Sequence, residues 1–244
     1  MTILQAGDHI VAAGALYGGT VTMLAVNLKK FGIETSFVSQ TDPGEWRAAM
    51  RPNTKLLFAE TPNNPLTEVC DIAALADIAH AGGALLLVDN CFCSPALQQP
   101  AKLGADFVVH SGTKYLDGQG RVIAGAVCGP AELIDSKLMP VMRSAGMSLS
   151  PFNAWVVLKG METLSIRMKT QSERALELAA SSDRPADGKG VALTPLACTV
   201  EADALRDGLR TQVVATLGLA PLTLVFFQQI SLVGFIANLV AIPL

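Results

Sequence analysis

At residues 82–90 the chain reads Gly82-Gly83-Ala84-Leu85-Leu86-Leu87-Val88-Asp89-Asn90. Two glycines precede an uninterrupted apolar run, and the first polar side chains follow directly after it. A short apolar run without alternation is typical of a strand that is buried on both faces, as in a parallel sheet covered by helices. The stretch therefore predicts a buried strand that ends at Asp89.

This pattern recurs along residues 1–180, where short apolar runs alternate with helix-like stretches. Such alternation predicts an α/β fold with a parallel sheet and crossover helices. The expected strands are His9–Ala13, Thr35–Val38, Leu56–Ala59, Ala84–Val88, Asp106–Val109 and Ile123–Cys128. The expected helices are Thr20–Phe31, Ile72–Ala81, Ala131–Arg143 and one long helix from Pro151 to about Ala180, in which Trp155, Leu158, Met161 and Leu164 recur at three-residue intervals.

The composition excludes several classes of function. Half of the 244 residues are hydrophobic, the formal net charge is −3, and the 18 Lys and Arg residues are scattered, so we expect no nucleic-acid binding. Five cysteines without a C-x-x-C pair or a signal peptide predict reduced thiols and a cytoplasmic protein. The three histidines have no ligand spacing relative to the cysteines, and Cys91 and Cys93 are interpreted as small apolar residues at a strand end, so no metal is expected.

Polar residues cluster where the expected strands end. Glu60 follows one strand, Asp89 another, and the segment Ser111-Gly112-Thr113-Lys114 a third. Open α/β sheets bind ligands outside the carboxyl ends of their strands. These residues are therefore the candidates for a binding site.

The candidate site contains the groups that a pyridoxal phosphate enzyme needs. Lys114 offers an amine for a Schiff base, Asp89 a carboxylate for the pyridine nitrogen, Ser111 and Thr113 hydroxyls for the phosphate, and Tyr17 a ring to stack on the cofactor. Each residue alone has a plainer reading, as a surface lysine, a helix cap or a turn. Their combination favours pyridoxal phosphate.

Four motifs in order carry a family resemblance. They are Tyr17-Gly18-Gly19-Thr20, Glu60-Thr61-Pro62-Asn63-Asn64-Pro65, Val88-Asp89-Asn90 and Ser111-Gly112-Thr113-Lys114-Tyr115. From about Gly7 to Ala180 the chain resembles the Cys/Met-metabolism family of pyridoxal phosphate enzymes. Two further segments, Asp117-Gly118-Gln119-Gly120-Arg121 and Leu149-Ser150-Pro151-Phe152-Asn153-Ala154-Trp155, are similar to its O-succinylhomoserine sulfhydrylases more than to its cystathionine enzymes.

The resemblance implies a fold, a set of roles and a reaction. The fold is the large domain of an aspartate-aminotransferase-like, pyridoxal-phosphate-dependent transferase, incomplete here, and the assembly is a homo-oligomer. Lys114 would be the Schiff-base lysine, Asp89 the pyridine partner, Ser111 and Thr113 phosphate ligands, Tyr17 the aromatic residue that also meets the substrate, and Asn64 a neighbour of the cofactor's phenolic oxygen. The substrates would be an O-acylated homoserine and sulfide, which give homocysteine by γ-replacement.

The chain departs from the family pattern at both ends. The pattern has an upstream Tyr-x-Arg and a glycine loop that complete the phosphate site, and the chain begins after both. The family's C-terminal domain, with an arginine for the substrate carboxylate, has no counterpart after Ala180. We expect weaker cofactor binding than in the family, because each lost charge-assisted hydrogen bond costs about 1.5 to 3 kcal/mol. Turnover is expected to suffer more than binding.

The composition changes after residue 180. Residues 181–204 are interpreted as a linker, and 205–244 as an unrelated apolar helical tail that carries no charge after Arg210. Its run 211–244 predicts either a buried helical hairpin or a segment in contact with a membrane. The last forty residues or so resemble multi-spanning competence proteins of the DNA-uptake channel, and the two resemblances together suggest a chimeric sequence.

Three functional hypotheses follow. The first is an enzyme, or the remnant of one, that binds pyridoxal phosphate and acts on an amino-acid substrate with sulfide. The second is a non-catalytic, membrane-associated chimeric fragment dominated by residues 211–244. The third is a carboxylate-binding or interaction domain that uses the same sheet without a cofactor.

Overall fold

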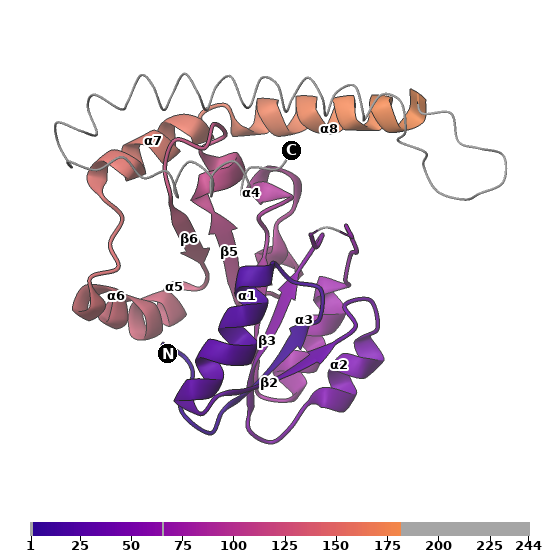
Figure 1. Ribbon diagram of the computed structural model, residues 1–244, viewed down its shortest axis with the longest axis vertical. Helices are drawn as coiled ribbons and strands as arrows, with labels where there is room; N and C mark the ends of the chain where they lie inside the picture. The colour runs from indigo at the N-terminus through magenta and orange to yellow at the C-terminus, as the bar shows by residue number, and fades with distance from the viewer. Residues whose placement is uncertain (1, 65, 182–244) are drawn as a thin grey trace, which may run out of the picture. The chain divides into compact units, whose positions relative to one another are not determined.

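The computed structural model describes residues 2–64 and 66–181. Within them, six strands form one sheet in the order β2-β1-β3-β4-β5-β6 (Figure 1). The strands are β1 His9–Ala13, β2 Glu34–Val38, β3 Thr54–Glu60, β4 Leu85–Asp89, β5 Phe107–Ser111 and β6 Gly125–Cys128. All of the predicted strands are found, and their bounds shift by a few residues at most.

Helical segments connect and follow the strands. They are α1 Gly18–Thr22, η1 Met23–Asn27, η2 Leu28–Phe31, α2 Pro43–Ala49, α3 Ile72–Ala81, α4 Ser94–Leu97, η3 Pro100–Leu103, η4 Gly112–Leu116, α5 Ala131–Leu133, η5 Ile134–Leu138, α6 Met139–Ala145, α7 Pro151–Met161 and α8 Leu164–Ser181. The chain divides into two compact units, Met1–Glu173 and Arg174–Leu244, and the site described below belongs to the first.

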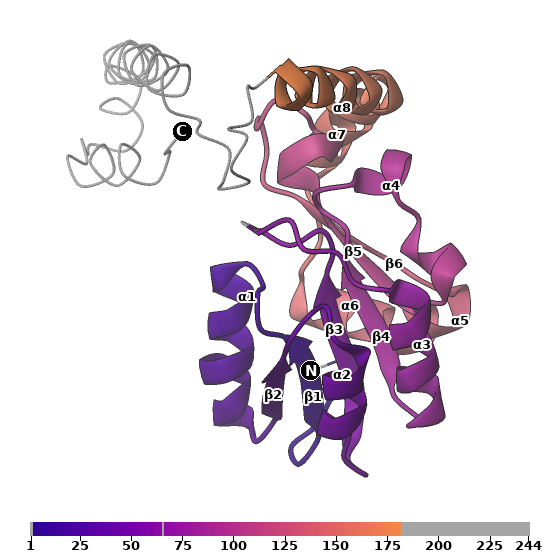
Figure 2. The ribbon, with the colours of Figure 1, turned by 90° about the vertical axis from the view of Figure 1, so that its right-hand side faces the viewer.

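The core lies around β1 and β3, whereas β4, for which the apolar run predicted burial on both faces, alternates between half-buried and buried residues. Every residue of β1 is buried. Figure 2 shows the helical stretch that begins with α1 on one side of the sheet and α2 and α3 on the other. Full burial of a Val, Leu or Ile side chain contributes about 1.5 to 3 kcal/mol, so these central strands hold the unit together. The ends of these strands are consequently held rigidly, and so are the side chains that stand there.

The helix α2 was missed by the sequence reasoning although its signals are local. The Asp42 side chain accepts a hydrogen bond from the Gly44 N–H at 2.7 Å, and Pro43 occupies the first helical turn, where its missing N–H costs nothing. The helix also buries Trp46 completely. The prediction failed because seven residues are too few to show a clear 3.6-residue repeat.

The prediction of a parallel sheet is wrong for its last strand. β6 pairs antiparallel with β5, whereas the other strand pairs are parallel. A parallel neighbour needs a crossover that returns the chain to the starting edge. Here the connection instead turns back through Gly118 and Gly120, whose φ values of 79° and 64° lie in the left-handed region that glycine readily adopts.

The predicted long helix after Pro151 is two helices, α7 and α8, with a break between Met161 and Leu164. At the break the Gly160 carbonyl accepts hydrogen bonds from the Thr163 N–H and from the Arg167 guanidinium, which end α7. Leu164 is buried, but the preceding members of the predicted apolar stripe, such as Trp155 and Leu158, are exposed.

The predicted linker 181–204 lies outside the described residues except for Ser181, which ends α8, and the apolar tail 205–244 lies wholly outside them. Within residues 2–64 and 66–181, none of the helices combines the length and the apolar character that crossing a bilayer requires.

Candidate active site

Three side chains stand at the carboxyl ends of adjacent parallel strands. Glu60 ends β3, Asp89 ends β4 and Ser111 ends β5. Glu60 and Asp89 are direct partners in the register of the sheet. The strand ends thus bring these residues to one edge of the sheet, as the sequence pattern predicted.

Lys114 and Tyr17 meet at this edge although they come from distant parts of the chain. The Lys114 Nζ lies 5.7 Å from the centroid of the Tyr17 ring. The Tyr17 main-chain N–H donates a 2.8 Å hydrogen bond to the Glu60 carboxylate. Tyr17 is 57% exposed, so part of this residue is accessible to a ligand.

Glu60 is a residue of the candidate site to which the sequence analysis assigned no role of its own, although it noted Glu60 at a strand end and in one of the four motifs. Its side chain is buried, and burial raises the pKa of its carboxyl group. The hydrogen bond from the Tyr17 N–H opposes this rise, and the nearby Asp89 carboxylate adds to it. Glu60 therefore anchors the main chain of Tyr17 and holds a carboxyl group beside Asp89.

Cys91 links Asp89 to the segment that carries the lysine. Its main-chain N–H donates to Asp89 Oδ1 at 3.0 Å, and its Sγ accepts the Ser111 main-chain N–H at 2.9 Å. Burial raises the pKa of the Cys91 thiol to about 12, helped by its hydrogen bond to Asp89 and by that carboxylate's charge. Burial also lowers the pKa of His110, although Asp89 opposes this change.

We expect Cys91 to resist alkylation by iodoacetamide in the folded protein at mildly alkaline pH, since the thiolate is the reactive form. The exposed Cys128 is the internal control and should be labelled, which peptide mass spectrometry would detect. Because the unfolded thiol ionises near 9.0 and the folded one near 12, Cys91 makes the folded state progressively less stable as pH rises between these values. Rapid labelling of Cys91 in the native protein would contradict this picture.

The remaining candidate residues differ in whether their polar groups already have hydrogen-bond partners. The Ser111 hydroxyl has no hydrogen-bond partner among the described residues, so it is free to bind a ligand oxygen. The Thr113 hydroxyl exchanges hydrogen bonds with the main chain of Ala124, donating at 3.4 Å and accepting at 3.2 Å. Asn64 is exposed, and the proximity of its main-chain N–H opposes the rise in the pKa of the Glu60 carboxyl group.

Comparison with known proteins shows which family this chain belongs to. The Cys/Met metabolism PLP-dependent enzyme family matches residues 1–183, which is most of the chain. The chain belongs to this family. The resemblance that the four motifs predicted is thereby confirmed, and the family's cofactor is pyridoxal phosphate.

The relatives found in this family catalyse several reactions. O-succinylhomoserine sulfhydrylase of Pseudomonas aeruginosa is 54% identical over 179 residues, which cover 73% of this chain and 44% of the relative. L-methionine gamma-lyase of Treponema denticola is 46% identical, over 73% of this chain and 45% of the relative. The chain thus spans less than half the length of these curated relatives.

Solved structures confirm the fold. The crystal structure of metB from Corynebacterium glutamicum superposes with a TM-score of 0.73 at 39% identity, covering 75% of this chain and 48% of that chain. Cystathionine gamma-lyase from Lactobacillus plantarum, complexed with L-serine, gives a TM-score of 0.71 at 36% identity, over 75% of this chain and 49% of that chain. The described unit therefore has the fold of pyridoxal-phosphate-dependent transsulfuration enzymes, as predicted.

A second family also matches. The competence protein family matches residues 140–244. This agrees with the resemblance predicted for the tail, but the match begins earlier than the last forty residues and overlaps the first family over 140–183.

The described side chains fit pyridoxal phosphate. The amine of the exposed Lys114 lies beside the ring of the exposed Tyr17, and the Asp89 carboxylate stands at the neighbouring strand end. Ser111 offers a free hydroxyl at the end of β5. These are the groups by which a protein holds the amine-reactive carbon, the ring, the ring nitrogen and the phosphate of this cofactor.

Metal binding has no comparable support. Among the described residues, no three His, Cys, Asp or Glu side chains come together as a metal site. Of the histidines, His9 bonds to Thr54 and Ser36, and His80 bonds to Asp106. Both thus have structural partners within the fold.

Proposed function

We propose that this chain binds pyridoxal phosphate through Lys114 and acts in γ-replacement on O-succinylhomoserine, with sulfide displacing succinate to give homocysteine. The observation that carries the proposal is the position of Lys114 Nζ beside the Tyr17 ring, with Asp89 at the adjacent strand end. The choice of substrate is supported by the 54% identity to an O-succinylhomoserine sulfhydrylase. Sulfide as the second substrate rests on the same relative.

Each residue has a role in this proposal. When bound, pyridoxal phosphate withdraws electrons from the α-carbon of the amino acid. Lys114 Nζ accepts the proton from that carbon and returns it later, since a positioned amine is an efficient general base. The Asp89 carboxylate keeps the proton on the pyridine nitrogen by its negative charge. Tyr17 would stack on the ring of the bound cofactor, and Asn64 would lie near its phenolic oxygen.

The phosphate would be held by Ser111 and Thr113. Ser111 has its hydroxyl free, whereas Thr113 must give up its hydrogen bonds with Ala124 to reach a phosphate oxygen. In the net reaction a bond forms between sulfur and the γ-carbon. The bond from that carbon to the ester oxygen breaks, and its electron pair leaves with the succinate carboxylate.

Titration of the purified chain with pyridoxal phosphate tests the cofactor part of the proposal. We expect a visible absorbance band that disappears on borohydride reduction, and the cofactor's mass on the peptide that contains Lys114. The loaded protein is then given sulfide with O-succinylhomoserine or with O-acetylhomoserine, and homocysteine is measured. A colourless protein in excess cofactor would refute the cofactor site, and equal rates with both esters would refute the preference for succinyl.

We also propose that the chain forms a homo-oligomer and is located in the cytoplasm. Exposed apolar side chains on α7, among them Phe152, Trp155 and Leu158, support contact with a second copy. Four free cysteines among the described residues support a reducing compartment.

A further inference from the structure

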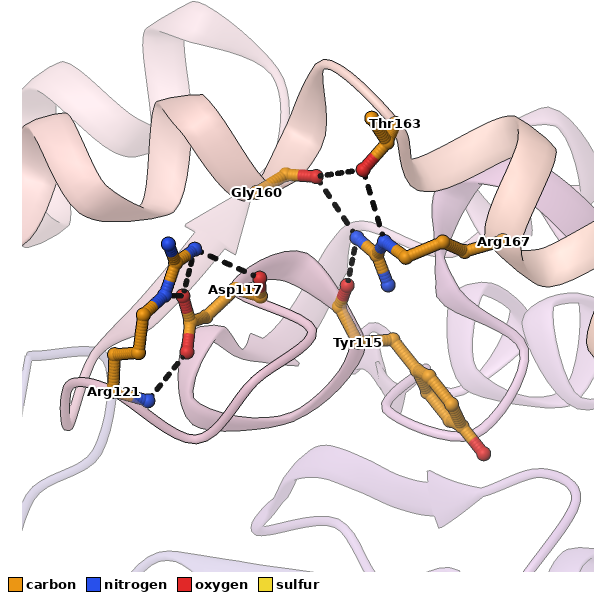
Figure 3. Close-up of polar contacts among 6 residues, drawn as sticks. All are labelled: Tyr115, Asp117, Arg121, Gly160, Thr163 and Arg167. Atoms are coloured by element: carbon orange, nitrogen blue, oxygen red, sulfur yellow. Dashed lines mark hydrogen bonds and ion pairs between the residues drawn. The ribbon is translucent and has the colours of Figure 1, made fainter.

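Arg167 at the start of α8 holds two segments together. Its Nη2 donates hydrogen bonds to the Tyr115 carbonyl at 2.9 Å and to the Gly160 carbonyl at 2.8 Å (Figure 3). Its Nε donates to the Thr163 Oγ1 at 3.1 Å. One guanidinium group therefore joins the end of α7 to the residue that directly follows Lys114.

The turn that carries Lys114 is closed by its own main-chain hydrogen bonds. The Asp117 N–H donates to the Gly112 carbonyl at 3.1 Å, and the Gly118 N–H donates to the Lys114 carbonyl at 2.7 Å. Inside this turn Lys114 leaves helical geometry, with φ −94° and ψ −120°. The direction of the Lys114 side chain thus depends on how Tyr115 to Gly118 are held.

Gly118 brings Arg167 into direct contact with this turn. A Cβ atom at Gly118 would lie 2.5 Å from both Cζ and Nη1 of Arg167, so any other residue there would require the guanidinium to move from this position. Arg167 Nη1 is buried and has no hydrogen-bond partner among the described residues. Burial of an unpaired donor costs free energy. The hydrogen bonds of Nη2 and Nε must therefore offset this cost to hold the guanidinium in its position.

The far end of the same turn is fixed independently. The buried Asp117 carboxylate accepts the Arg121 Nε–H at 2.8 Å and the Arg121 main-chain N–H at 2.6 Å (Figure 3). Burial raises the pKa of Asp117, but the hydrogen bonds and charge of Arg121 outweigh burial and hold it below its usual range. Asp117 and Arg121 thus stabilise the part of the turn that follows Gly118, whereas Arg167 binds the part that precedes it, at Tyr115.

We propose that Arg167 is a positioning residue of the active site, which holds Tyr115 and Gly118 so that Lys114 points toward Tyr17. This inference rests on the proposed function, because it assigns Arg167 to the lysine that binds the cofactor. A role confined to capping α7 would need only the bond to Gly160. The bond to Tyr115 and the packing on Gly118 connect Arg167 to the lysine.

The experiment compares Arg167→Lys and Arg167→Ala with the wild-type chain. Lysine keeps the charge but lacks the planar fork that reaches two carbonyls from a fixed position. Arg174→Ala is the matched control, since Arg174 lies on the same helix, is exposed and pairs only with Glu177 among the described residues. Affinity for pyridoxal phosphate, visible circular dichroism of the bound cofactor and amide hydrogen exchange at Gly118 without cofactor are measured.

We expect both Arg167 variants to bind pyridoxal phosphate about tenfold more weakly or worse, a factor that corresponds to about 1.4 kcal/mol. The circular dichroism of the bound cofactor should change, because its orientation follows that of Lys114. Gly118 exchange should become faster, and Arg174→Ala should resemble the wild type. Should Arg167→Ala fail to fold, Arg167→Lys carries the test.

Wild-type affinity, circular dichroism and Gly118 exchange in Arg167→Lys would overturn the inference. Should the wild-type chain itself bind no pyridoxal phosphate, the proposed function fails, and Gly118 exchange alone decides the role of Arg167. Faster exchange in the variants then supports the hold on the turn, and unchanged exchange refutes it.

Discussion

Lys114→Ala abolishes covalent attachment of pyridoxal phosphate and leaves the fold intact. The side chain is exposed at the edge of the sheet, so its removal should change the free energy of unfolding by no more than about 0.5 kcal/mol. Without the amine, the chain cannot form the bond that borohydride makes permanent. The visible band and the mass gain on the peptide should both be lost.

Two further variants make this result specific. Lys114→Arg keeps a positive charge near Tyr17, but a guanidinium stays protonated and does not attack a carbonyl. It should therefore behave like Lys114→Ala toward borohydride. Lys169→Ala removes an exposed lysine on α8 and should match the wild type. Mass gain on another lysine in Lys114→Ala would show that the cofactor is held elsewhere.

Gly160→Ala destabilises the described unit by about 1 to 3 kcal/mol, the range found when atoms are inserted into a packed interior. A Cβ atom at this position would overlap the main-chain carbonyls of Leu116 and Asp117, which cannot move aside as a flexible side chain can. Helix propensity alone would favour alanine by about 1 kcal/mol, so the sign of the change identifies the close contact. Urea unfolding followed by circular dichroism measures it.

Gly18→Ala is the control for this substitution. A Cβ atom at Gly18 has no neighbour within 4 Å, and Gly18 lies at the start of α1. Its free energy of unfolding should stay close to that of the wild type. A Gly160→Ala protein as stable as Gly18→Ala would show that α7 and the lysine turn are not packed as closely as described.

The sequence predicted those parts of the fold and site that depend on local patterns. The apolar run 84–88 and the polar residue after it were sufficient to place Asp89 at the end of a strand, because both signals lie within a few residues. Lys114 and Ser111 were found in the same way. The direction of β6 was not, since it depends on the turn at Gly118 and Gly120.

Contacts between distant segments could not be predicted from a single sequence. The hydrogen bond from Tyr17 to Glu60 joins the residue before α1 to the end of β3, and the one from Arg167 to Tyr115 joins α8 to the lysine turn. Neither pair has a spacing that marks it. The same is true of Cys91, whose Sγ accepts the Ser111 main-chain N–H only when β4 and β5 lie side by side.

Tyr17 is attached to the sheet by its main chain, because the Glu60 carboxylate binds its N–H rather than its phenol group. This hydrogen bond therefore does not depend on which side chain stands at position 17. Phenylalanine or histidine there would inherit the same location beside the lysine and alter only the chemistry offered to a ligand. Position 17 therefore allows the side chain beside the lysine to be replaced without a change in the main chain that holds it.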